Sequence, residues 1–161
     1  MTITILTAIA GLIATVYIGY AVIKSKGIPD SISATAYAIK HKKTFTAAMM
    51  GVSALILPEL LDDSADNTKF LAFLSIIGLM MVGLTPDYRT KEQGKLHYIG
   101  AFLAAVGSQL MLALNDPIAL LGWVFYPILL LLQKGKNYAF WAEIICLLNM
   151  FFYLLYNTAS K

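Results

Sequence analysis

Six apolar stretches alternate with short polar segments along the chain. They cover about residues 2–23, 44–61, 68–85, 96–114, 118–133 and 138–157. A membrane-spanning helix needs about 20 mostly apolar residues to cross a hydrocarbon core of about 30 Å. The pattern therefore predicts an all-α fold, a polytopic transmembrane bundle of six helices that forms a single integral membrane domain over residues 1–161. The fifth stretch is short for a span and contains Gly122 and Pro127.

Positive charge is concentrated in the polar segments that follow the first, third and fifth stretches. Of the 12 Lys and Arg residues, all except Lys69 and Lys161 lie in those segments. Short loops rich in Lys and Arg stay on the cytoplasmic side of a membrane. The sequence therefore predicts a multi-pass protein of the bacterial cytoplasmic (inner) membrane, with the N-terminus and the C-terminus outside.

The opposite side is expected to carry negative charge. Its acidic residues are spaced by three and four positions and would share one helical face: Glu59, Asp62, Asp63 and Asp66. Hard oxygen ligands of this kind suit calcium, but the loop pattern of a dedicated calcium site is missing. We expect a solvated acidic cap.

The polar segment between the first two stretches is long enough to hold a structure of its own. Ile32, Ala36 and Ile39 recur at helical spacing, while Ser33, Lys40 and Lys43 lie off that stripe. This pattern predicts a short cytoplasmic helix over about residues 31–41, lying in the membrane interface with its lysines near the headgroups. The alternative is a plain structured linker between two spans.

Composition supports a membrane protein and narrows the chemistry. Hydrophobic residues make up 59% of the 161 residues and charged residues 13%, against about 25% charged in soluble domains. With one Cys and two His, we expect neither a metal site nor a cofactor. The net charge of +3 is spread between apolar stretches, so nucleic acid is not an expected partner.

The most distinctive motif joins the third and fourth stretches. A span ends in Gly83-Leu84-Thr85-Pro86, a polar loop follows, and the next span opens with His97-Tyr98-Ile99-Gly100-Ala101. This pattern resembles small six-span bacterial membrane proteins with no assigned activity and is remotely similar to the Frag/DRAM type. The resemblance implies a six-helix fold with a cytoplasmic Pro…His corner, and it implies no catalytic role for Asp87 or His97.

Polar residues of this corner are candidates for binding or proton relay. His97 is expected to bond to Asp87, to Tyr88 or to the free carbonyls that end the third span. Its functions would be to tie two helices together or to act as a general base or proton relay. Arg89 is expected to attract an anionic headgroup, together with Lys91 and Lys95.

Further candidates lie inside predicted spans. Glu143 falls within the last span, about two turns after Lys136, where an ionisable group costs roughly 2.5–3.5 kcal/mol and is usually partnered or functional. Lys136, seven residues earlier, is a candidate partner. Gln109 and Asn149 lie nearer the midplane and are expected to bond between helices. On the fourth span, the small residues Gly100, Ala104 and Ser108 predict a helix-packing seam.

Three functions remain open from the sequence. The first is binding or transport of a lipid or small molecule inside the bundle, with Glu143, Gln109 and Asn149 lining its cavity. The second is an accessory or regulatory role, in which the small-residue seam and the first loop bind another membrane protein or a second copy. The third is a membrane-embedded enzyme, which would need His97 and Asp87 within hydrogen-bond reach.

Overall fold

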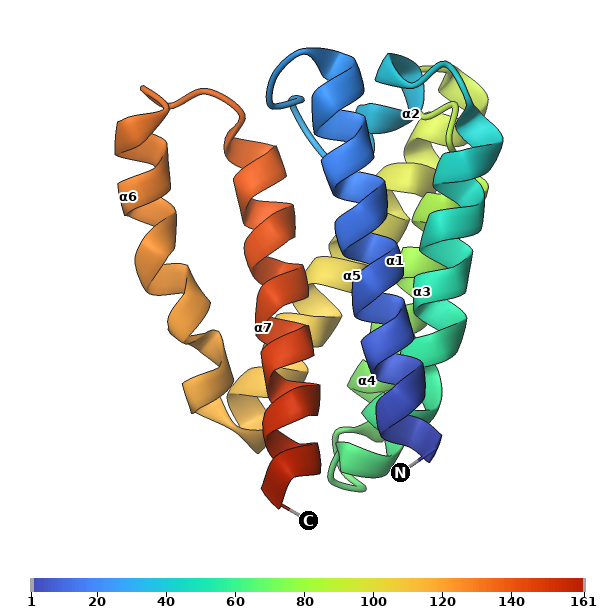
Figure 1. Ribbon diagram of the computed structural model, residues 1–161. Coiled ribbons are helices and arrows are strands. Elements are labelled where there is room, and N and C mark those ends of the chain that lie inside the picture. The colour runs from blue at the N-terminus through green and yellow to red at the C-terminus, as the bar shows by residue number, and fades with distance from the viewer. Residues whose placement is uncertain (1, 161) are drawn as a thin grey trace.

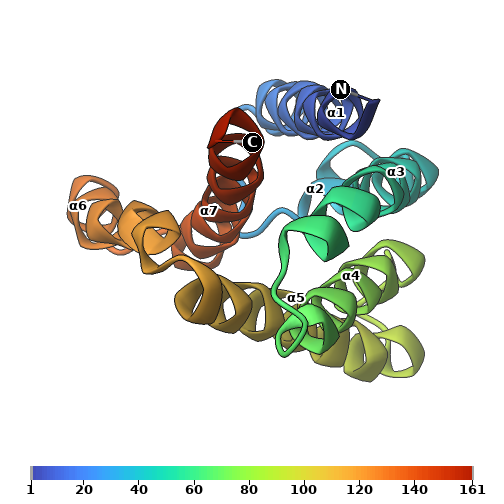
Figure 2. The same ribbon diagram turned by 90° about the horizontal axis from the view of Figure 1, so that it is seen from below.

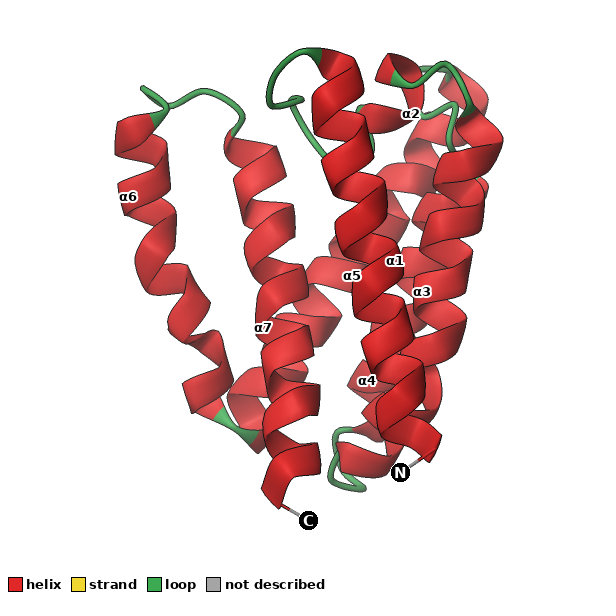
Figure 3. Cartoon of the chain, viewed as in Figure 1, coloured by secondary structure: helices red, strands yellow, loops and turns green. Residues whose placement is uncertain are grey.

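The computed structural model describes residues 2–160, and over that range it is all-helical (Figure 1; Figure 3). The elements in chain order are α1 (Thr2–Ser25), α2 (Thr35–Ala38), α3 (Lys42–Asp63), α4 (Lys69–Leu84), α5 (Lys91–Asn115), the 3-10 helix η1 (Pro117–Val124), α6 (Phe125–Leu132) and α7 (Tyr138–Ser160). The all-α prediction is confirmed. Four helices, α1, α3, α5 and α7, are long and apolar enough to cross a membrane, whereas α4 and the η1–α6 segment are shorter.

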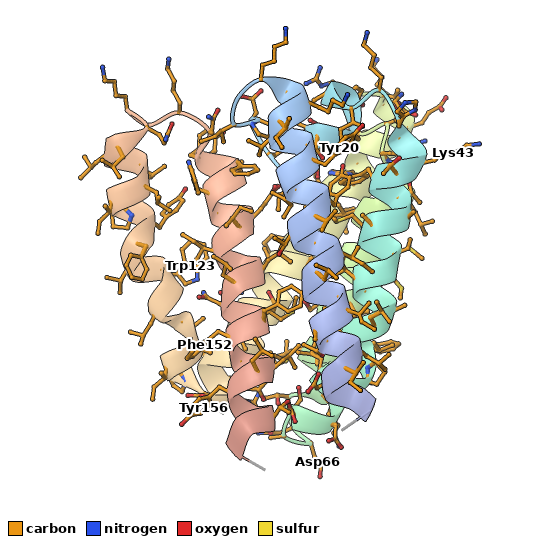
Figure 4. The ribbon with its side chains drawn as sticks, in the orientation of Figure 1. Tyr20, Lys43, Asp66, Trp123, Phe152 and Tyr156 are labelled. Carbon is orange, nitrogen blue, oxygen red and sulfur yellow. The ribbon has the colours of Figure 1, made fainter. Side chains whose placement is uncertain are left out.

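The long helices run side by side, with the two ends of the chain at the same end of the bundle (Figure 1). The loops after α1, α4 and α6 all lie at the opposite end, and within residues 2–160 these loops and the helix turns next to them hold every Lys and Arg except Lys69. Lys43 and Asp66 mark the two ends in Figure 4. Seen along the bundle, α6 stands outermost and packs against α7 and η1, while α3, α4 and α5 follow one another on the other side (Figure 2).

Small residues let α4 and α5 pack with their backbones in close approach. A Cβ atom added at Gly78 would lie 2.4 Å from the Ala104 nitrogen and 2.5 Å from the Gly100 oxygen. A Cβ added at Gly100 would in turn lie 2.8 Å from the Gly78 oxygen. Ser75 adds a hydrogen bond from its hydroxyl to the Ala104 carbonyl at 3.1 Å. The predicted seam on α5 is therefore present, and α4 of the same chain occupies it.

The segment between α1 and α3 differs from the prediction of a surface helix over 31–41. Within it, α2 spans only Thr35–Ala38, and residues 32–36 are buried inside the protein. Ile32, Ala36 and Ile39 pack in a core cluster with Tyr17 of α1 and Phe45 of α3. The predicted apolar stripe is therefore present, but it packs against helices of the bundle and not against lipid. We call residues 30–36 the inserted segment.

The acidic cap also differs from the prediction at Glu59. This side chain is only 3% exposed, and its carboxylate accepts hydrogen bonds from the hydroxyls of Thr7 in α1 and Thr158 in α7. Asp66, in contrast, is exposed and pairs with Lys69 at 2.7 Å. That hydrogen bond and the charge of Lys69 lower the pKa of Asp66. Glu59 is thus part of the helix packing and not of a solvated cap.

Candidate functional site

A cavity of about 640 Å³ lies within the bundle, and we call it the central cavity. Its walls come from α3, α4, α5, η1, α7 and the inserted segment, and most of the lining side chains are apolar. Val106 and Leu110 of α5 line it and are also 45% and 46% exposed. The central cavity therefore reaches the outer surface of the bundle beside α5. Its volume is typical of small-molecule sites, which run from about 300 to 1,000 Å³.

Glu143 of α7 is the acidic residue in the lining of this cavity. Its Oε2 accepts a hydrogen bond from the backbone N–H of Ile32 in the inserted segment. Within residues 2–160 the ion pairs are Lys42–Asp87 and Lys69–Asp66, so the expected link from Glu143 to Lys136 is not formed. A carboxylate contact to a backbone amide 111 residues away in sequence leaves no signal in periodicity or spacing.

Gln109 of α5 and Asn149 of α7 meet at the inner wall, as the expectation of interhelical bonding requires. The Asn149 amide donates to Gln109 Oε1 at 3.0 Å, and the Trp123 indole N–H of η1 donates to the same oxygen at 2.9 Å. Gly122 permits this approach, because a Cβ there would lie 2.1 Å from Asn149 Oδ1. Trp123 lies between the two ends of the bundle (Figure 4). Sequence reasoning did not identify it as the third member.

His97 of α5 is 2% exposed and has a partner at each ring nitrogen. Its Nδ1 lies 2.9 Å from the Thr85 carbonyl, and its Nε2 lies 2.9 Å from the Ser33 hydroxyl of the inserted segment. A carbonyl only accepts, so the Nδ1 atom carries a proton and donates to Thr85, while Nε2 and the Ser33 hydroxyl pair with each other. The imidazole therefore ties α4, α5 and the inserted segment together. Of the partners expected for His97, the structure shows a backbone carbonyl at the end of α4.

The structure does not bring His97 and Asp87 together. The Asp87 carboxylate pairs with Lys42 of α3, and its backbone N–H donates to Gln93 Oε1 at 2.9 Å. Arg89 is exposed and lies over the Tyr37 ring at 4.5 Å from its centroid. These contacts hold the α4–α5 corner against the start of α3 and against α2. The pairing of His97 with Asp87 that an enzyme would need is therefore missing. Arg89 does not line the central cavity.

A second cavity, of about 530 Å³, lies toward the Lys-rich end, and we call it the polar cavity. Asp30 and Glu143 contribute carboxylates, His97 contributes its imidazole, and three tyrosines contribute further rings. These are Tyr88, Tyr98 and Tyr138. Ser33, Ala101 and Glu143 line both cavities, so the two spaces adjoin at these residues. The sequence did not identify Asp30 as a site residue, and next to it Ser31 accepts a hydrogen bond from the Ala34 N–H at 3.0 Å.

The described residues contain no group of three or more His, Cys, Asp or Glu side chains that could hold a metal ion. Comparison of the chain with family models, with curated proteins and with solved structures finds no match. The two cavities are therefore the features of the chain that bear on its function.

Proposed function

We propose that this protein is an integral membrane protein that binds or carries a lipid or another amphipathic small molecule in its central cavity. The observation that carries the proposal is a space of about 640 Å³ with apolar walls, a carboxylate at one end and the Gln109 amide on its side. Ligand sites combine such apolar walls with a few polar groups that orient the bound molecule. Access from the lipid side fits the exposed lining residues of α5.

All six apolar segments cross the membrane in this proposal, including the two shorter ones. At 1.5 Å per residue, α4 is about 24 Å long. The segment from Pro117 to Leu132 gains length because its first half is a 3-10 helix, which rises about 2.0 Å per residue, so it reaches about 28 Å. Both values approach a hydrocarbon thickness of about 30 Å, and the bilayer adapts to a small mismatch.

We place the Lys-rich end in the cytoplasm and both termini outside, in a bacterial inner membrane, because Lys-rich loops are retained. The test uses single cysteines in a background where Cys146 is replaced by Ser. A membrane-impermeant maleimide added to intact cells is expected to label the Asp66→Cys variant. The Lys91→Cys variant is expected to react only after permeabilisation, and the reverse pattern would overturn the orientation.

The accessory role has less support, because the small-residue seam on α5 is already covered by α4. An enzyme has less support as well, because Asp87 and His97 bind different partners. The basic side chains Arg89, Lys91 and Lys95 remain available at the membrane surface, but none lines the central cavity. Binding in the central cavity is therefore the function to test first.

The test is native mass spectrometry of gently purified protein, with two matched variants. Ala105→Phe places a ring into the central cavity, whereas Ala54→Phe makes the same change at an exposed position of α3. We expect wild type and Ala54→Phe to retain a stoichiometric lipid or small molecule that Ala105→Phe has lost. An empty wild-type protein, or a bound molecule that Ala105→Phe retains in full, would refute central-cavity binding.

A further inference from the structure

The polar cavity has the features of a site for an organic cation. Carboxylates reach it from two separate elements, Asp30 at the start of the inserted segment and Glu143 in α7. No Lys or Arg is among its lining residues, although it lies at the Lys-rich end of the bundle. Lys43, at that end, points away from the bundle (Figure 4).

Neither carboxylate is paired with a positive side chain in the described part of the chain. Glu143 accepts one backbone N–H through Oε2, and Oε1 receives no donor from residues 2–160. The Asp30 side chain is exposed and has no hydrogen bond there, since only its backbone oxygen is engaged, by the Phe140 N–H at 3.1 Å. His97 also lines this cavity, and its ring is held by Thr85 and Ser33. The two carboxylates of the lining therefore favour a positive ligand over a negative one.

Aromatic rings complete the site. Tyr88 stacks on His97 at 4.7 Å between centroids and meets Tyr98 edge-on at 6.2 Å. Tyr138 adds a third ring from the start of α7. Ring faces attract cations, and groups of rings recognise quaternary ammonium ions. Two carboxylates beside three tyrosine rings thus match an alkylammonium group better than a strongly hydrated inorganic cation.

The adjoining cavity indicates what is attached to this headgroup. Because Ser33, Ala101 and Glu143 line both spaces, the apolar central cavity begins where the polar cavity ends. We propose that the ligand is a cationic amphiphile, with an organic ammonium headgroup in the polar cavity between Asp30, Glu143 and the tyrosines and its alkyl chain in the central cavity. This inference rests on the proposed function and specifies the ligand class for it.

The test compares three probes with the same twelve-carbon chain: dodecyltrimethylammonium, dodecanol and dodecanoate. Binding to full-length protein in neutral maltoside micelles is followed by the fluorescence of Trp123, which lines the central cavity, in a background where the second tryptophan, Trp141, is replaced by Phe. Protein-free micelles and the Ala105→Phe variant correct for partitioning. We expect the ammonium probe to bind at least about tenfold more tightly than the alcohol, and the carboxylate to bind weakest.

Variants then separate the headgroup site from the chain site. Asp30→Asn and Glu143→Gln are expected to weaken the ammonium probe by about tenfold each. Asp30 lines only the polar cavity, so Asp30→Asn is also expected to leave dodecanol unchanged. Asp116→Asn, a carboxylate at the opposite end, is the matched control and should change neither. Equal affinity for the three probes, with Asp30→Asn silent, would overturn the cationic headgroup and leave the proposed function standing. Failure of all three probes to bind would refute the proposed function itself.

Discussion

Replacing Glu143 with leucine is expected to release the inserted segment from α7. In the wild type, the backbone N–H of Ile32 donates to the Glu143 carboxylate, and Ile32 is 5% exposed. A hydrogen bond to a charged group contributes about 1.5–3 kcal/mol net. Because each 1.4 kcal/mol is a factor of ten in an equilibrium constant, the open population of the segment should rise by about 10- to 100-fold.

The assay is amide hydrogen exchange at Ile32, which reports local opening directly. We expect its protection in Glu143→Leu to fall by about 10- to 100-fold, with α4 and α5 amides unchanged. Glu143→Gln keeps an acceptor oxygen at the same place, and a neutral hydrogen bond is about half as strong, so its loss should be smaller. The reasoning is refuted if the Ile32 amide exchanges equally fast in wild type and Glu143→Leu.

Three further variants test the packing of the bundle through the free energy of unfolding in mixed micelles. Gln109→Leu removes the oxygen that accepts from Trp123 and Asn149, and it should lower the free energy of unfolding by about 1–2 kcal/mol, at roughly 0.6 kcal/mol per bond. A change near zero would contradict a stabilising role of these two hydrogen bonds. Gly78→Ala should cost about 1–3 kcal/mol, because its Cβ would meet backbone atoms of α5 at 2.4 Å, whereas Gly19→Ala, with nothing within 4 Å, should stabilise slightly. Glu59→Leu should cost about 1–3 kcal/mol because two hydroxyls lose their acceptor, and the exposed Asp66→Asn control should stay within about 0.5 kcal/mol. Equal effects of the two substitutions would contradict the buried role of Glu59.

The helices could be predicted from the sequence because apolar length is a local property. Each predicted span coincides with a helix to within a few residues, and the fifth coincides with η1 followed by α6. The 3-10 winding of η1 leaves no mark in the apolar pattern, and η1 packs against α5 and α7. The close approach of Gly122 to Asn149 belongs to that packing.

The candidate site was predictable in its residues but not in its connections. Polarity inside apolar stretches identified Glu143, Gln109 and Asn149, which do line the central cavity or bond at its wall. The stripe of Ile32, Ala36 and Ile39 showed that something covers those side chains. It could not show whether lipid or protein does so, because an amphipathic pattern records the need for burial and not the partner.

The Glu143 carboxylate links ligand binding to the closure of the inserted segment. Glu143 Oε2 holds the Ile32 amide, and Oε1 accepts no bond from the described residues, so an ammonium headgroup can approach Oε1 without displacing the segment. Ligand binding and segment closure then favour each other, and such coupling is reciprocal. We therefore expect dodecyltrimethylammonium to slow exchange at the Ile32 amide in the wild type and to have no effect in Glu143→Leu. Faster exchange on binding would show that the headgroup competes with the segment for the same oxygen.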